Sequence, residues 1–412
     1  MNIGNVGFVS SSSDTGTPES GCPFALGIAA GLRSSMQAVL DGLPGCSSRP
    51  TEIARVIGVS RVMVSRTASS IKKENPIETL TSIPGPESLR SIVNGARQAG
   101  VSKEISDRAL RAIDEFDGLI RERFGTRSAL NAALSTQNTE SLDRFEQASR
   151  YQVFKGMGQV LGVQANTWIT SMMLIPNPSN PDLLDVTTLH GTVGLRRLRS
   201  DTPIHFSHGT PPKIATNREA PERIEIDLSS FYEHNPAPLE SKIVNGQLIH
   251  TFSATDTGKD AKYDMLAVVH APGTSSRYAS ENRSKRGISV IPDVPVVTLV
   301  ADILLHGDLF DGIDPQLSIY NMMARGGASP DDRSRDIDLV ASSSSDSIRQ
   351  LGSGLDALAL PEIPSYQGML QRVVDEFGYN TEDFRAYRLR IAYPVIGFQF
   401  VIAFEAPPKP SA

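Results

Sequence analysis

The chain has 412 residues, more than a single hydrophobic core ordinarily serves, so two or three folding units are expected. Its composition, with 39% hydrophobic and 21% charged residues, excludes a fibrous or wholly disordered chain, and its two cysteines exclude a disulfide scaffold and a four-cysteine zinc module. A net charge of −6 argues against a general binder of polyanions.

The N-terminal residues 1–20 are predicted to form a flexible arm. The segment 10–20 is small and polar without apolar periodicity, and no basic residue precedes the first apolar residues, so no secretory signal is expected. The longest apolar run, 391–404, is shorter than the roughly 18–20 residues that a membrane span requires, and it predicts buried strands. We therefore expect a cytoplasmic chain that binds no membrane.

The first 165 residues are predicted to be α-helical. Apolar residues recur there at steps of three and four, prolines stand near the starts of the helical stretches, and glycines stand at their ends. The expected helices cover 23–40, two short stretches between 50 and 70, 87–99, 102–124 and 142–161.

The pattern changes near Asn166. Short apolar runs and alternation replace the helical spacing and predict strands, with one further helix at 366–377. The segment 325–347 is rich in Gly, Ser and Asp and predicts a long mobile loop. The expected strands cover 168–175, 223–228, 247–252, 265–270, 288–291, 295–305 and 387–404.

Positive charge is concentrated in one window of the helical part. Residues 47–103 hold nine basic and four acidic side chains, a local charge of +5, so the rest of the chain sums to −11. A basic module within an acidic chain indicates that one part binds phosphates and that the rest does not.

This window contains a segment, 50–70, whose residues suit two helices joined by a tight turn. A helix-turn-helix needs a small residue where its helices cross, and Ala54 supplies it. The turn needs a residue that tolerates positive φ, and Gly58 follows four positions later. Val59 and Val64 have the spacing of inward-facing residues in the turn and in the second helix.

The motif Gly58-Val59-Ser60, followed by Val64-Ser65-Arg66, resembles the helix-turn-helix of bacterial transcription regulators, nearest to the lac-repressor type. Thr67 stands where repressors of that type usually carry a branched apolar residue. The resemblance is confined to this segment, and nothing after Asn75 resembles the sugar-binding body of that family. It therefore implies DNA binding and no particular effector.

The outward positions of the second helix are the expected base-reading residues. Arginine donates bidentately to guanine, and serine reaches bases or phosphates. Lysines beyond the helix end are expected to contact phosphate without reading sequence. The predicted DNA-binding residues are Thr51, Ser60, Arg61, Val62, Ser65, Arg66, Ser69, Lys72 and Lys73.

Two weaker patterns do not predict a site. His205 and His208 are three positions apart, and a strand would point them to opposite faces, which is poor geometry for holding a metal ion. Gly156, Gly158 and Gly162 lie inside a helical pattern with no strand before them, where close helix packing is expected in place of a phosphate loop. No catalytic residue, metal site or cofactor is predicted.

The leading hypothesis is a sequence-specific DNA-binding transcriptional regulator and not an enzyme. Its expected partners are double-stranded DNA, a second copy of the chain in a homodimer, and a small-molecule effector or protein partner of the C-terminal domain. Two alternatives stay open: a structural or mobile-element DNA-binding protein, and an enzyme that uses the helical module for positioning.

The predicted fold class is α+β, with an N-terminal all-α helix-turn-helix module and connecting helices, followed by a larger, mainly-β C-terminal domain. The predicted domains are the flexible arm 1–20, a helix-turn-helix DNA-binding domain 21–75, a helical connector with a possible role in dimerisation 76–165, and a β-rich sensory or interaction domain 166–412.

Overall fold

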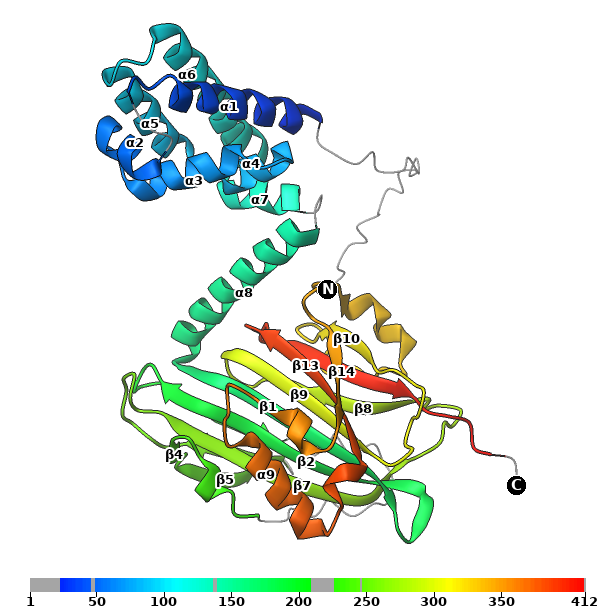
Figure 1. Cartoon of the computed structure of the whole chain (residues 1–412). Coiled ribbons are helices and arrows are strands. Elements are labelled where there is room, and N and C mark those ends of the chain that lie inside the picture. Colours follow the sequence, from blue (N-terminus) through cyan, green and yellow to red (C-terminus); the bar gives the residue numbers. More distant parts are fainter. Residues whose placement is uncertain (1–22, 46–48, 136–138, 209–225, 245–246, 411–412) are drawn as a thin grey trace, which may run out of the picture. The chain divides into compact units, whose positions relative to one another are not determined.

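The structure is a computed structural model that describes residues 23–45, 49–135, 139–208, 226–244 and 247–410 (Figure 1). The fold class is α+β, as predicted, with helices in the N-terminal part and mainly sheets in the C-terminal part. The chain divides into two compact units between Phe145 and Glu146, which we call unit 1 and unit 2. The arm expected at 1–20 lies outside the described residues.

Unit 1 is helical throughout its described residues. A π-helix, Leu119–Phe124, directly follows α6. The α-helices are α1 (Pro23–Asp41), α2 (Pro50–Ile57), α3 (Arg61–Ile71), α4 (Pro76–Ser82), α5 (Pro86–Gln98), α6 (Lys103–Gly118) and α7 (Arg127–Ser135).

These helices share one hydrophobic core. Its fully buried side chains come from six of the helices, α7 included, and burying each is worth about 1.5–3 kcal/mol. They include Leu32 of α1, Val64 of α3, Leu80 of α4, Ile92 of α5 and Ile113 of α6. The sequence predicts a helical connector, 76–165, separate from the helix-turn-helix domain. In the structure, α4 to α7 pack into the same unit as α2 and α3.

Helix α8 (Thr139–Leu161) crosses the division, and its C-terminal half belongs to unit 2. Arg150 donates hydrogen bonds of 2.9 and 2.6 Å to the two carboxylate oxygens of Asp346, whose side chain is almost completely buried. One turn later Phe154 is buried, with its ring 5.3 Å from that of Tyr393. The structure therefore divides the chain inside α8, and not at 165/166 where the periodicity changes.

These contacts predict that unit 2 depends on the second half of α8. A fragment of residues 146–412 is expected to be more stable than one of residues 162–412 by at least about 3 kcal/mol, the usual cost of losing one buried phenylalanine. Chemical denaturation followed by circular dichroism measures the difference. The variant Arg150→Gln in the longer fragment isolates the ion pair, and equal stabilities of the two fragments would contradict the division inside α8.

The described residues of unit 2 form three sheets. The seven-stranded sheet has the order β12-β13-β9-β1-β2-β7-β4, the four-stranded sheet β11-β10-β14-β8, and the three-stranded sheet β3-β6-β5. The strands are β1 (Val163–Asn177), β2 (Asn180–Arg197), β3 (His205–His208), β4 (Asn235–Pro236), β5 (Leu239–Val244), β6 (Gln247–Phe252), β7 (Tyr263–Ser276), β8 (Lys285–Val290), β9 (Val296–His306), β10 (Gln316–Asn321), β11 (Leu339–Val340), β12 (Ile348–Ser353), β13 (Phe384–Ala392) and β14 (Phe398–Glu405).

The predicted strands and helix of the C-terminal part are largely present, with two exceptions. The predicted helix is α9 (Tyr366–Phe377). The predicted stretch 387–404 becomes β13 and β14, which lie in different sheets. Residues 226–228, within the strand predicted at 223–228, form no strand, and the rest of that stretch lies outside the described residues.

Both faces of the seven-stranded sheet are covered. Side chains alternate along its central strands, so each strand contributes to a core on either face. On β9, Leu299 and Ile303 enter the core that this sheet shares with β8 and β14 of the four-stranded sheet. Val300 and Leu304 enter the core on the other face, which is shared with α9. Both β9 and α9 are labelled in Figure 1. In the described residues the seven-stranded sheet thus packs against the four-stranded sheet on one face and against α9 on the other.

A buried polar network ties α9 to this sheet. The fully buried carboxylate of Asp302 on β9 accepts hydrogen bonds of 2.9 and 2.8 Å from Arg388 on β13 and one of 2.6 Å from the Tyr366 hydroxyl on α9. Burial, and then the charge of Asp302, raise the pKa of Tyr366 well above its usual value, so the hydroxyl remains a donor. Burial acts to lower the pKa of Arg388, but the hydrogen bonds and the charge of Asp302, together with Tyr366, outweigh that effect, so the pKa is raised.

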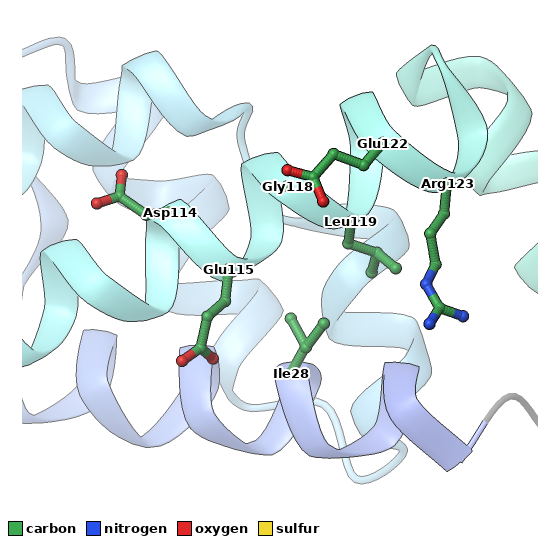
Figure 2. Close-up of a pocket in the computed structure, with 7 residues that line it drawn as sticks. All are labelled: Ile28, Asp114, Glu115, Gly118, Leu119, Glu122 and Arg123. Carbon is green, nitrogen blue, oxygen red and sulfur yellow. The ribbon is translucent and has the colours of Figure 1, made fainter.

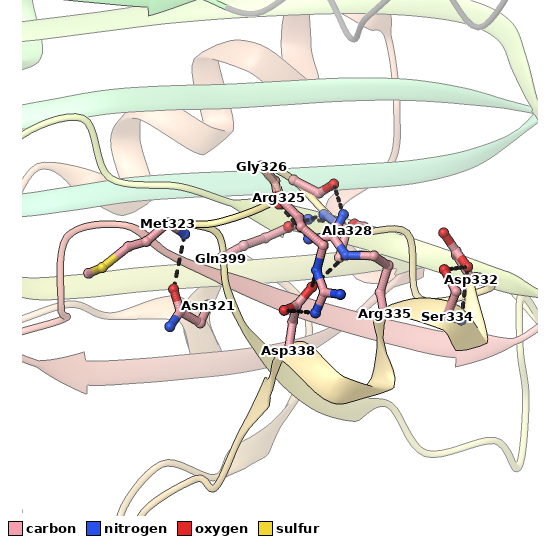
Figure 3. Close-up of polar contacts among 11 residues, drawn as sticks. Asn321, Met323, Arg325, Gly326, Ala328, Asp332, Ser334, Arg335, Asp338 and Gln399 are labelled. Atoms are coloured by element: carbon pink, nitrogen blue, oxygen red, sulfur yellow. Dashed lines mark hydrogen bonds and ion pairs between the residues drawn. The ribbon is translucent and has the colours of Figure 1, made fainter. Parts of the chain in front are cut away.

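The segment 325–347, predicted to be a long mobile loop, is folded. It contains a 3-10 helix, Arg333–Asp338, and Figure 3 shows the guanidinium groups of Arg325 and Arg335 converging on the carboxylate of Asp338. The prediction of a long loop therefore missed the 3-10 helix and the ion pairs, because composition does not reveal that these charged side chains find partners within the segment.

Candidate nucleic-acid interface

The residues between α2 and α3 form a tight turn that orients α3. Gly58 ends α2 with φ at 69°, in the left-handed region that favours glycine. The amide of Val59 donates to the carbonyl of Ala54 at 3.1 Å, and the Ser60 hydroxyl accepts a hydrogen bond of 3.2 Å from the amide of Val62. The turn and the cap of α3 therefore have the local structure predicted for them.

A second contact holds the end of α2 in place. Helix α5 passes so close that a Cβ on Gly95 would lie 2.2 Å from the carbonyl oxygen of Ile57. On α3, Thr67 is fully buried because its hydroxyl donates to the carbonyl of Met63 at 2.9 Å. Since the hydroxyl is satisfied within the helix, threonine can occupy the place of a branched apolar residue.

The outer surface of α2 and α3 is basic. Residues 53–73 contain five basic side chains and no acidic one. Among the exposed side chains is Val62, which is 65% exposed at the second position of α3. The exposed predicted residues are Thr51, Ser60, Arg61, Val62, Arg66, Ser69 and Lys72, and Ser65 is half-buried.

The two lysines beyond α3 are not equivalent. Lys72 is exposed, whereas Lys73 is half-buried and lies 3.5 Å from the carboxylate of Glu78. An ion pair with a neighbouring carboxylate leaves less positive charge for a phosphate. The structure therefore distinguishes two residues that sequence position treats alike.

Two more cations lie on this side of unit 1, and sequence reasoning missed both. Arg55 is exposed on α2, four positions after Thr51, a spacing that could have placed it on the same face. Arg127 of α7 donates to the carbonyl of Ile83 at 3.0 Å and is half-buried. Burial, and then the charge of Arg66, lower the pKa of Arg127 to about 10, so it stays cationic at neutral pH. No sequence signal links Arg127 with α3.

A pocket in unit 1 has the opposite charge. It has a volume of about 430 Å³ and is lined by residues of α1, α6 and the π-helix (Figure 2). Figure 2 shows Ile28 and Leu119 facing one another across it. The remaining lining residues are Asp114, Glu115, Gly118, Glu122 and Arg123. The acidic residues at this pocket belong to α6 and the π-helix, and no residue of α2 or α3 lines it.

The weaker sequence patterns have structural explanations. His205 lies 3.0 Å from the hydroxyl of Thr251. A Cβ on Gly158 would lie 2.2 Å from the side-chain nitrogen of Gln164, so this glycine allows α8 to pack closely on β1. Among the described residues, no group of three His, Cys, Asp or Glu side chains could hold a metal ion.

Comparisons of the chain with protein-family models, with curated proteins and with solved structures found no match. No helix within the described part of the chain has both the length and the apolar character needed to span a membrane.

Proposed function

We propose that the chain is a sequence-specific DNA-binding transcriptional regulator that acts in the cytoplasm, with α3 in the major groove. The observation that carries the proposal is the left-handed turn at Gly58, which joins α2 to a capped helix with an exposed basic face. A recognition helix needs this combination, because its first turns must project from the module to reach base edges.

The exposed residues of α3 suit base reading. Arg61 and Arg66 can each donate two hydrogen bonds to guanine, and Val62 offers an apolar surface for the methyl group of thymine. Lys72, at the C-terminal end of the helix, suits a phosphate contact. One such module contacts little DNA, so two copies on half-sites roughly 34–36 Å apart are expected.

Unit 2 is proposed to receive the regulatory signal. Apolar side chains are exposed in and just before its folded segment 325–347, with Ile337 75% and Met323 70% exposed. Arg335 forms an ion pair with Asp338 in the same segment. Exposed apolar residues on a segment that ion pairs hold in place favour a protein partner. A pocket of about 290 Å³, lined by Arg277 and Phe310 among others, offers room for a small effector.

Selection of binding sites from random duplex DNA, repeated at several salt concentrations, tests the proposal. An enriched, two-part motif at moderate salt is expected. If the full chain binds all duplexes alike and loses them together as salt rises, the binding is electrostatic only and the proposed regulator is wrong.

The four cations of α3 and its C-terminal end are expected to respond differently to alanine substitution. Arg61→Ala and Arg66→Ala should each weaken binding to the selected site by about 1–3 kcal/mol and relax the preference at one base pair. Lys72→Ala should weaken all sequences alike and flatten the salt dependence, and Lys73→Ala should do so less, since Lys73 is paired with Glu78. Fluorescence anisotropy on matched and mismatched duplexes measures both effects. Identical behaviour of all four variants would mean that α3 is not the reading helix.

A further inference from the structure

The described residues of unit 2 cover one face of its part of α8. Phe154 is buried, Arg150 pairs with Asp346, and Gly158 lies tightly against Gln164. At 3.6 residues per turn, Arg150, Phe154 and Gly158 follow one another along a single side of the helix. This side is the one that the sheets hold.

Another side of the same helix carries Val153, Gly156 and Val160. These positions fall within about 60° of arc, turned away from Phe154. Val153 is 40% and Val160 67% exposed. A Cβ on Gly156 would meet no described atom within 4 Å, so no contact within the described chain explains a residue that costs a helix about 1 kcal/mol relative to alanine.

The composition of this side differs from that of a solvent-facing helix in the same protein. In residues 151–160 the exposed side chains include only one charge, Lys155. By contrast, every exposed residue of α6 is charged: Lys103, Glu104, Arg108, Arg111, Asp114 and Glu115. Depletion of charge around exposed apolar side chains is typical of the centre of a protein interface.

We propose that the stripe Val153–Gly156–Val160 is the dimer interface and that the same stripe of a second copy covers it. This inference rests on the proposed function in one respect: a regulator that binds two half-sites needs two copies of the chain. The stripe suits a two-fold contact because Gly156 lies between the valines, so two helices that cross there set the valines of one copy against those of the other.

Charge also favours a second copy over a different partner. The neighbours on one flank of the stripe, Gln152 and Gln159, are uncharged and create no repulsion when two copies meet. The ammonium group of Lys155 lies 5.6 Å from the centre of the Tyr151 ring, on its own helix. A highly charged partner would find Lys155 as the one exposed charge in residues 151–160.

Sedimentation equilibrium of the full chain without DNA, over a dilution series, tests the interface. The wild-type chain is expected at twice the chain mass, and the double variant Val153→Glu/Val160→Glu at the chain mass. The matched control Gln316→Glu/Gln350→Glu places the same charges on exposed residues of β10 and β12 in unit 2 and should stay dimeric. A monomeric wild-type chain, or a dimer that the α8 variant leaves intact, would overturn the proposal.

A second variant separates the interface from folding. Gly156→Ala should raise the unfolding temperature of the monomeric double variant, because alanine favours helix and has room. In the wild-type background it should raise the dimer dissociation constant by at least ten-fold, because the added methyl group lies where the helices cross. An unchanged dissociation constant would overturn the placement of Gly156 at the crossing.

The outcomes distinguish this inference from the proposed function. A dimer that depends on α8 but selects no DNA sequence supports the interface and rejects the regulator. Sequence-specific binding by a chain that stays monomeric on and off DNA supports the regulator and overturns the interface.

Discussion

Valine in place of Gly58 is expected to abolish sequence-specific DNA binding while unit 2 stays folded. Gly58 has a φ of 69°, and a β-branched residue is strongly disfavoured there. A Cβ at Gly58 would meet no described atom within 4 Å, so the effect would come from backbone strain and not from a clash. Strain of this kind costs about 1–3 kcal/mol, and the turn can relieve it by moving α3 away from its orientation.

The matched control at this position is Gly58→Asn. Asparagine tolerates the left-handed region much better than valine, so this variant should retain most of the binding to the selected site. Anisotropy with the selected duplex measures binding, and circular dichroism of both variants measures folding. Normal binding by Gly58→Val would show that α3 does not depend on this turn.

Alanine in place of Asp302 is expected to destabilise unit 2 by about 3–5 kcal/mol, because it leaves the guanidinium of Arg388 buried without its counter-charge. The hydroxyl of Tyr366 would lose its acceptor at the same time, although it keeps Ser171 at 2.7 Å. Chemical denaturation should therefore separate the unfolding of unit 2 from that of unit 1, which shares none of these contacts.

Two further variants show whether the ion pair or the packing is responsible. Tyr366→Phe removes one hydrogen bond from Asp302 and should cost only about 1 kcal/mol. The double variant Asp302→Leu/Arg388→Met removes both charges and should recover much of the stability lost in Asp302→Ala, because no unpaired buried charge remains. A double variant as unstable as Asp302→Ala would indicate that shape and not charge sets the cost.

The turn between α2 and α3 could be predicted because its requirements are local. Gly58 and Ser60 act on backbone atoms within a few positions, and the inward residues follow the helical period. The folded segment around Asp338 could not be predicted, because its structure depends on contacts that are not local. Its low-complexity composition describes each residue separately, whereas its structure depends on Arg325 finding a carboxylate thirteen positions away.

The sequence by itself determined the α+β class, the places of most helices and strands, and the exposed residues of α3, since periodicity and turn chemistry depend on near neighbours. The tertiary structure alone decided that α4 to α7 join the unit of α2 and α3, and that the division falls inside α8, where Arg150 pairs with Asp346. It also decided which charged side chains form ion pairs within the fold, such as Lys73 with Glu78, and which stay exposed, such as Arg61. The physical reason is that burial and pairing depend on which distant segments meet, and side chains far apart in the sequence carry no local sign of their partners.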